Sequence, residues 1–259
     1  MGEEDLSAME VHILASGSDG NCAIVRHEDT AVMIDAGLTG KRVSQLMAIH
    51  GIDASEIKAL FITHEHADHI KGAGVIARKF DCPIICNDPT FSACGDMGKV
   101  EHTTIRMYQP MTVGTITLTP LPTSHDARYP CCYTFEAGGM RGTIATDTGY
   151  YTHEVKQALK DSNIAVMESN YDKRMLDEGP YSDWLKKRIN GDLGHVSNVL
   201  CGRTLGDIYT PDKKIFLAHL SRTNNFPDLA KETVSALAGI SRYKLDCLDN
   251  LEDSRILKC

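Results

Sequence analysis

Short apolar runs separated by polar and glycine-rich turns mark the first half of the chain. Runs of this length between turn residues are typical of buried strands. The pattern predicts strands at 11–15, 22–25, 31–34, 59–62, 83–86, 103–108, 115–121, 132–135 and 142–145. The second and third runs are expected to pair as a hairpin, and the turn Gly138–Gly139 is expected to join the last two strands.

Apolar residues also recur at helical spacing. Val43, Leu46 and Met47 share one face of a predicted helix at 42–50, which Gly51 ends. Further helices are predicted at 70–80, 152–160, 180–189, 196–205 and 228–238, and strands at 164–168 and 214–218. Because strands and helices alternate in both halves, we expect an α/β fold with two sheets packed face to face and helices outside. No linker or repeat interrupts the sequence, so residues 1–259 are expected to form a single domain.

The bulk composition narrows the class of protein. With 259 residues, of which 42% are hydrophobic, the chain can bury a substantial core. No apolar run approaches the roughly 18 residues of a membrane span, so no membrane partner is expected. The acidic start lacks the basic residues of a secretory signal, and nine scattered cysteines are typical of free thiols. We therefore expect a cytoplasmic protein.

The formal net charge of −8 argues against nucleic-acid binding through bulk charge. A local basic groove stays open as an alternative, because the C-terminal third carries several cations. These are Lys173, Arg174, the run 186–188, Arg203 and Arg222. The run 186–188 taken alone is more typical of a solvated helix face.

The segment directly after the predicted strand 59–62 carries the main candidate chemistry. Its ligand-type side chains are His64, His66, Asp68 and His69. Imidazole and carboxylate together suit zinc, manganese or iron(II), and crowding them is unfavourable unless a cation compensates for the lost solvation. The residue four after His64 is Asp68, so the helical His-Glu-x-x-His zinc motif is absent. We expect a metal-binding loop that enters a helix near Ile70.

Further ligand types follow other predicted strands. Asp35, His125, Asp147 and His219 each stand just past a short apolar run. Taken singly, such residues are usually turn or loop residues. Because functional groups gather on the loops at strand ends, the four residues together with the first segment indicate one shared site.

The order of these residues resembles that of the metallo-β-lactamase superfamily over nearly the whole chain. The resemblance implies a four-layer αβ/βα sandwich with two divalent metals at one edge, zinc foremost and manganese or iron(II) as alternatives. The implied ligands of one metal are His64, His66 and His125. Those of the second are Asp68, His69 and His219, with Asp147 bridging the two metals. Asp35 matches the family's first motif, a carboxylate that orients the ligands from behind.

The segment 194–198 narrows the resemblance to nuclease branches such as ribonuclease Z and ribonuclease J. The N-terminus of the helix that follows would attract a phosphate, which His195 could contact or protonate. Alternatively, Ser197 merely caps that helix and His195 is a loop histidine. True β-lactamases often carry Cys at the position of Asp147, and flavodiiron proteins carry Glu at that of His66, so both are disfavoured. The long insert of ribonuclease J is absent.

Six segments together resemble the YycJ/WalJ group, whose members are linked to DNA exonuclease activity. They are 15–21, 63–72, 124–127, 168–172, 194–198 and 219–225. Relatives often carry His where this chain has Tyr171, so Tyr171 is assigned no metal role.

The resemblance implies a metal-dependent phosphodiester hydrolase, namely an exonuclease acting on DNA or RNA. A hydroxide shared by the two metals would attack phosphorus, with Asp68 or Asp147 orienting it and His195 as the other catalytic group. Residues expected to donate hydrogen bonds to phosphate oxygens are Ser16, Asn21, Ser197 and Asn198. Two alternatives stay open: a thioester hydrolase of the glyoxalase II type, and a metal-bearing binding protein without turnover.

Overall fold

The computed structural model describes residues 8–249 and 253–258. The strands of one sheet are β1 (Glu10–Ala15), β2 (Cys22–His27), β3 (Thr30–Ile34), β4 (Ile57–Phe61), β5 (Ile84–Cys86), β6 (His102–Thr104) and β14 (Arg255–Lys258). Those of the other are β7 (Met111–Val113), β8 (Ile116–Pro122), β9 (Cys131–Ala137), β10 (Met140–Ala145), β11 (Ile164–Glu168), β12 (Lys214–Ala218) and β13 (Leu245–Asp246). The strand orders are β14-β1-β2-β3-β4-β5-β6 and β13-β12-β11-β10-β9-β8-β7.

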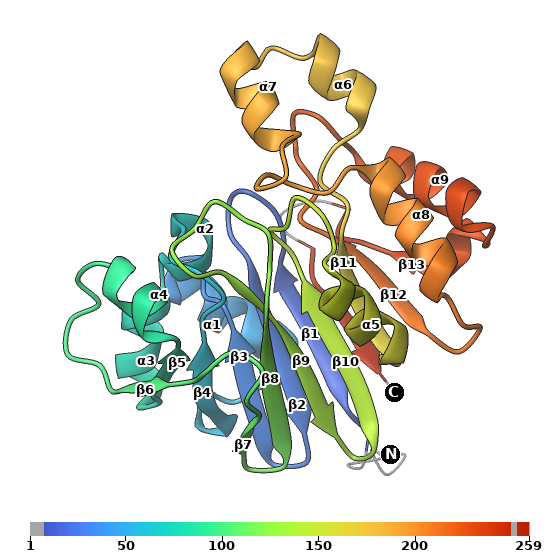
Figure 1. Cartoon of the computed structure of the whole chain (residues 1–259). Coiled ribbons are helices and arrows are strands. Elements are labelled where there is room, and N and C mark those ends of the chain that lie inside the picture. Colours follow the sequence, from blue (N-terminus) through green and yellow to red (C-terminus); the bar gives the residue numbers. More distant parts are fainter. Residues whose placement is uncertain (1–7, 250–252, 259) are drawn as a thin grey trace.

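Helices cover the outer faces of both sheets (Figure 1). Beside the first sheet lie α1 (Gly40–Ile49), α2 (Ala67–Ile70), α3 (Ala73–Phe80) and α4 (Asp88–Ala93). Beside the second lie α5 (His153–Asp161), α8 (Asn198–Ile208) and α9 (Pro227–Ala238), whereas α6 (Lys173–Glu178) and α7 (Asp183–Ile189) project beyond the sheets. This order of layers confirms the predicted four-layer αβ/βα sandwich. Among the residues that the structure describes, no helix has the length and apolar character needed to cross a membrane.

The main core lies between the two sheets. Its buried side chains include Val25, Val32 and Phe61 from the first sheet and Leu118, Phe135 and Phe216 from the second. The Tyr133 ring on β9 packs edge-on against Phe61 at 5.4 Å, and its hydroxyl donates to the Ile62 carbonyl at 3.0 Å. Each large buried side chain contributes roughly 1.5–3 kcal/mol. The shared core supports the prediction of one domain, which stays a prediction.

Most predicted elements form, some with the predicted ends and others with ends shifted by a few residues. The predicted strands 164–168 and 214–218 have the same ends as β11 and β12. The predicted hairpin pairs β2 with β3 in antiparallel register. Between β9 and β10, Gly138 and Gly139 have φ angles of 56° and 75°, as the expected tight turn requires.

The predicted helix 70–80 is wrong in one respect, because the chain forms two helices, α2 and α3, separated at Gly72. The Gly72 N–H donates to the Ala36 carbonyl at 2.7 Å. A Cβ at this position would lie 2.2 Å from the Leu38 carbonyl oxygen. Close backbone packing therefore interrupts the helix, and α2 stays a short segment that carries the ligand-type residues.

Other boundaries also differ from the predictions. The predicted helices 180–189 and 196–205 begin later, at Asp183 and Asn198, because Ser182 and Ser197 occupy the N-cap positions. The predicted strand 103–108 is the shorter β6, which ends at Thr104. The elements α4, α6, β7, β13 and β14 were not predicted; each has six residues or fewer, too few for a periodic pattern.

The carboxyl ends of parallel strands bring the candidate residues to one edge of the sandwich. β3 pairs in parallel with β4, and β10, β11 and β12 pair in parallel in the other sheet. Asp35 follows β3, Asp147 follows β10, and His219 follows β12. Because parallel strands end on the same side, the two sheets present their candidate residues at a common edge.

Candidate metal centre

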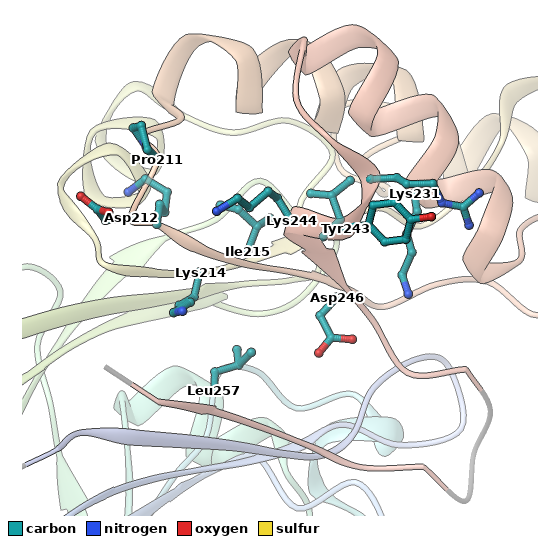
Figure 2. Close-up of a pocket in the computed structure, with 12 residues that line it drawn as sticks. Pro211, Asp212, Lys214, Ile215, Lys231, Tyr243, Lys244, Asp246 and Leu257 are labelled. Atoms are coloured by element: carbon teal, nitrogen blue, oxygen red, sulfur yellow. The ribbon is translucent and has the colours of Figure 1, made fainter. Parts of the chain in front are cut away.

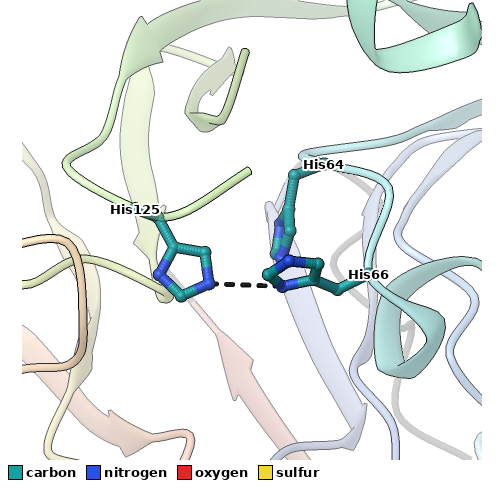
Figure 3. A group of neighbouring side chains, drawn as sticks. All are labelled: His64, His66 and His125. Atoms are coloured by element: carbon teal, nitrogen blue, oxygen red, sulfur yellow. Dashed lines mark hydrogen bonds between the residues drawn. The ribbon is translucent and has the colours of Figure 1, made fainter. Parts of the chain in front are cut away.

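Three histidines form the first cluster. His64 and His66 follow β4, and His125 follows β8. One ring nitrogen of each lies within 4.8 Å of the others, and His125 Nε2 lies 3.3 Å from His66 Nδ1. His125 Nδ1 lies 3.0 Å from the Gly194 carbonyl oxygen, which directs its Nε2 toward the cluster. Figure 3 shows the three rings gathered around a common point.

The second cluster joins both halves of the chain. Its members are Asp68, His69, Asp147 and His219, with one ligand atom of each within 4.8 Å of the others. Asp147 Oδ2 lies 3.1 Å from His69 Nε2. Asp147 Oδ1 lies 3.4 Å from His219 Nε2 and 3.7 Å from His125 Nε2, so this carboxylate lies between the clusters. The structure thus brings all seven predicted ligands together.

The donor atoms of the two clusters suit divalent metal ions. The Nε2 atoms of His64 and His219 are buried and have no hydrogen-bond partner. A buried polar group left unsatisfied costs roughly 1–3 kcal/mol. Convergent imidazole nitrogens and carboxylate oxygens are the donors that zinc, manganese and iron(II) accept. The clusters therefore fit two metal ions, as the sequence predicts.

The backbone is strained at two of the candidate ligands, Asp147 and His219, and at Asp35. Asp35, Asp147 and His219 have φ angles of 59°, 55° and 56°, in the left-handed region. This conformation costs on the order of 1 kcal/mol or more for a residue other than glycine. Each residue follows a parallel strand, and the left-handed turn directs its side chain inward at the edge of the sheet. Such strain clusters at functional sites.

Asp35 supports the second cluster from behind. Its Oδ2 lies 2.7 Å from Nδ1 of His69 and accepts a hydrogen bond from the Thr63 hydroxyl at 2.8 Å. Its Oδ1 accepts the Thr63 backbone N–H at 2.9 Å. A carboxylate on Nδ1 fixes the ring and leaves Nε2 for a metal. The geometry is the one expected for the orienting role predicted from the sequence.

Glu168, the last residue of β11, is part of the site but was given no role from the sequence. Its carboxylate is buried, and Oε1 lies 2.7 Å from Nδ1 of His195 and 3.1 Å from Nδ1 of His219. Oε2 accepts the Thr148 N–H at 2.9 Å. Among the described residues, Nε2 of His195 has no hydrogen-bond partner. The available signal was a carboxylate at the end of an apolar strand.

The carboxylates in and around the second cluster attract either protons or metal ions. Burial lowers the pKa of His64 well below its usual range, so this ring is neutral. Burial opposes a proton on His219, but Asp147 and Glu168 outweigh it and raise the pKa of His219 to about 10. Burial also opposes a proton on His69, whose pKa Asp147 and Asp35 raise well above its usual value.

Two predicted phosphate contacts lie in the turn after β1. The Ser16 hydroxyl accepts the His219 N–H at 2.7 Å, and its own hydrogen stays available to a ligand. The Asn21 side chain accepts the Gly17 N–H at 2.9 Å, and its Nδ2 lies 3.3 Å from Asp68 Oδ2 and 3.0 Å from His69 Nε2. The Asn21 amide thus contacts candidate ligands, and phosphate binding by either residue stays a prediction.

The other two predicted phosphate contacts lie at the start of α8. The Ser197 hydroxyl accepts the Leu200 N–H at 3.2 Å as an N-cap, which matches the alternative reading of this residue. Asn198 has no exposed surface, and its side chain is bonded to Ser169 and Asn225 at 2.6 and 2.9 Å. The structure does not bring Asn198 to a surface that a phosphate can reach. Tyr171, assigned no metal role, donates to Asn190 at 2.7 Å.

The candidate basic groove is largely neutralised by ion pairs. Lys173 and Arg174 pair with carboxylates four residues later on α6. Arg188 pairs with Asp126 at 2.6 Å, and Arg222 pairs with Asp19 at 2.6 Å. Arg203 is exposed on α8. The structure therefore does not gather these cations into one unpaired patch.

Comparisons with known proteins agree with this geometry. The family model of the metallo-β-lactamase superfamily matches residues 15–192. The chain is 37% identical over 228 residues to exodeoxyribonuclease YycJ of Bacillus anthracis, covering 86% of each protein. It is 36% identical over 232 residues to exodeoxyribonuclease WalJ of Streptococcus pneumoniae, covering 86% of this chain and 85% of the relative.

The fold is also that of a solved structure of low sequence identity. The metallo-β-lactamase fold protein YhfI from Bacillus subtilis superposes with a TM-score of 0.75 at 16% identity, over 97% of this chain and 100% of that one. The predicted family, fold and hydrolase class are confirmed. The chain belongs to the metallo-β-lactamase superfamily and, within it, to the group of YycJ and WalJ.

Proposed function

We propose that this protein is a metal-dependent exonuclease that hydrolyses phosphodiester bonds at the ends of DNA strands. The observation that carries the proposal is the His195–Glu168 pair beside the second cluster. Phosphodiester hydrolysis requires neutralisation of developing charge and a proton for the leaving oxygen. The pair can supply both next to the candidate metal ligands. The names of YycJ and WalJ, both exodeoxyribonucleases, favour DNA over RNA.

In this proposal the two clusters hold divalent cations, zinc first and manganese or iron(II) as alternatives. One cation would be held by His64, His66 and His125. The other would be held by Asp68, His69 and His219, with Asp147 shared between the two. Bound cations at these positions would lower the pKa of a water molecule toward about 7 and neutralise charge on the phosphate.

His195 is the proposed acid. Because its Nδ1 faces Glu168 at 2.7 Å, a proton given to the substrate would leave from Nε2. The buried carboxylate of Glu168 fixes the orientation of this ring. Asp68 has a side chain that is 23% exposed, against 4% for Asp147. We therefore assign to Asp68 the role of orienting the attacking water.

A groove beside the first cluster is the proposed path of the nucleic-acid strand. Its cavity of about 760 Å³ is lined by Asp88, Pro89, Ser92, Ala93, Arg128 and Tyr129. The Arg128 N–H donates to Glu65, which stands between two ligand histidines, so the groove adjoins the cluster. We assign Arg128 to a phosphate and Tyr129, which is 46% exposed, to a base.

The proposal includes a cytoplasmic location. The eight described cysteines are free thiols, as in a reducing compartment. Burial raises the pKa of Cys132 and of Cys201 to about 12, so these thiols are protonated and unreactive at neutral pH.

An assay with end-labelled substrates tests the proposed activity. Purified protein, loaded with zinc or with manganese, would be given single-stranded DNA, duplex DNA, RNA and S-lactoylglutathione. We expect labelled DNA to shorten from an end. Faster hydrolysis of RNA would reassign the substrate. Efficient cleavage of S-lactoylglutathione without phosphodiester cleavage would favour the thioester hydrolase, and metal binding without any turnover would favour the binding protein.

A further inference from the structure

A second cavity lies at the opposite end of β12 from the candidate metal centre (Figure 2). It measures about 850 Å³ and is bordered by β12, β13, β14 and the short 3-10 helix Arg242–Lys244. Lys214 begins β12, whereas His219 directly follows its end. At about 3.3 Å per strand residue, the two sites are separated by on the order of 15 Å. The cavity is therefore distinct from the proposed reaction site.

The lining of this cavity is basic, although the chain has a formal net charge of −8. Its basic residues are Lys213, Lys214, Lys231, Arg242 and Lys244, and its acidic residues are Asp212 and Asp246. Five basic and two acidic residues leave a local surplus of positive charge. Such a concave positive region concentrates anions from solution.

Several of these charges are already engaged. Lys213 donates to backbone carbonyls at the end of α5, so its ammonium group serves the fold. Arg242 pairs with Asp228 at 2.6 Å, and Asp246 pairs with Arg255 at 3.4 Å. These contacts remove one acidic and two basic residues from the groups available to a ligand.

Lys214 and Lys244 stay available. Both are exposed, and neither has a carboxylate within ion-pair distance among the described residues. Tyr243 stands beside Lys244 in the sequence, and its side chain is 92% exposed at one end of the cavity (Figure 2). Tyr243, Lys214 and Lys244 line the same cavity. An exposed aromatic ring and unpaired ammonium groups in one cavity can together bind a nucleotide, because the ring stacks on a base while the cations hold phosphate.

We propose that this cavity binds one nucleotide unit, with its phosphate on Lys214 and Lys244 and its base against Tyr243. The volume lies within the range of about 300–1,000 Å³ that is typical of small-ligand sites. The nucleotide is either a free mononucleotide or part of a single strand, and both share the phosphate and base chemistry. This site rests on its own residues and does not depend on the proposed exonuclease activity.

Calorimetric titrations of the full chain in the presence of a chelator test the site. The probes are dAMP, inorganic phosphate and a 5′-phosphorylated dA₈ strand, at low and at moderate salt. We expect dAMP or the strand to bind more tightly than inorganic phosphate and to lose affinity as salt rises. The double variant Lys214→Ala, Lys244→Ala should lose at least tenfold in affinity. Tyr243→Ala should weaken the nucleotide probes and leave phosphate binding unchanged.

The matched control is Lys41→Ala, Lys99→Ala, which removes two exposed lysines elsewhere and should bind as the unaltered chain does. Tight dAMP binding identifies the free nucleotide as ligand, whereas binding of the strand alone identifies a nucleotide within a strand. The inference is overturned if neither probe exceeds phosphate in affinity, or if their affinities are unchanged in the Lys214 and Lys244 double variant. Thermal melts of both double variants verify that they fold.

Discussion

Glu168 Oε1 lies 2.7 Å from Nδ1 of His195. The same oxygen lies 3.1 Å from Nδ1 of His219, a candidate metal ligand. One buried carboxylate therefore links the proposed acid to the second cluster. Because the two imidazoles share this partner, a change at Glu168 should affect proton transfer and metal binding together.

Glu168→Gln keeps the shape of this side chain and removes its charge. We expect kcat to fall by at least about tenfold, because a neutral amide holds the ring of His195 less firmly in the orientation for proton transfer. We also expect the affinity for one metal equivalent to fall by about 10- to 100-fold. Glu136→Gln, at an exposed position on β9, is the control. Unchanged turnover and metal content in the Glu168 variant would remove Glu168 from the site.

His195→Ala separates catalysis from metal binding. The variant should retain both metal equivalents and its thermal stability but lose turnover by roughly 10²-fold or more. Exposed His153 supplies the control His153→Ala, which should behave as the unaltered protein. Loss of a metal equivalent on replacing His195 would place it among the ligands, and full activity would make it an ordinary loop histidine.

Asp35→Asn tests the support of the second cluster. Asp35 Oδ2 lies 2.7 Å from His69 Nδ1, and the neutral amide should hold this ring less firmly. Metal titration should show one site weakened by about 10- to 100-fold and the other nearly unchanged. Asp81→Asn is the matched control, because Asp81 also has a left-handed backbone, with φ 51°, but is exposed. Equal metal affinities in both variants would contradict the orienting role.

Metal uptake should release protons from the second cluster. The pKa of His219 is raised to about 10 and that of His69 is raised well above its usual value, so both rings favour the protonated form when no metal is bound. A metal ligand must be a neutral imidazole, so about two protons should be released. Calorimetry of metal binding in two buffers of different ionisation enthalpy measures this number. Uptake without proton release would show that neither ring is protonated beforehand.

The raised pKa of His219 also predicts whether the metal-free protein gains or loses stability as pH rises. A proton that His219 binds more tightly in the folded state stabilises that state. This stabilisation is fully present below pH 6.5, the ordinary pKa of a histidine side chain. This contribution is lost as pH rises from 6.5 toward about 10. Thermal melts in chelator should therefore decline over this range, whereas saturation with metal should reduce the decline. A melting temperature that rises over the same range in chelator would contradict the direction of the shift.

The sequence predicts which ligand-type residues gather at one edge of the sandwich, because these residues carry local signals. His64, Asp147 and His219 each follow a short apolar run, and strand ends of a parallel sheet meet at one edge. Glu168 was missed because its partners are distant in the chain: His195 and His219 lie 27 and 51 residues away. No local pattern shows that a carboxylate ending a strand will face two imidazoles.

Residues that contact a ligand are harder to predict than residues that hold a metal. Asn198 lies in a motif that suggested phosphate binding, yet its side chain is buried against Ser169 and Asn225. Asn21 faces Asp68 and His69, which are 47 and 48 residues away. The short strands β13 and β14 were also missed, because an edge strand of two or four residues is defined by its neighbour and not by its own pattern.

The most direct test of the proposal that two metal ions support exonuclease activity is a metal titration in which DNA hydrolysis is measured after each addition. Protein stripped by chelator would receive zinc or manganese in fractions of an equivalent, with shortening of an end-labelled DNA strand as the signal. We expect turnover to rise to a plateau at two equivalents and the double variant His64→Ala, Asp147→Ala to stay inactive. Hydrolysis by the stripped protein, or by the double variant at the rate of the unaltered chain, would contradict the account.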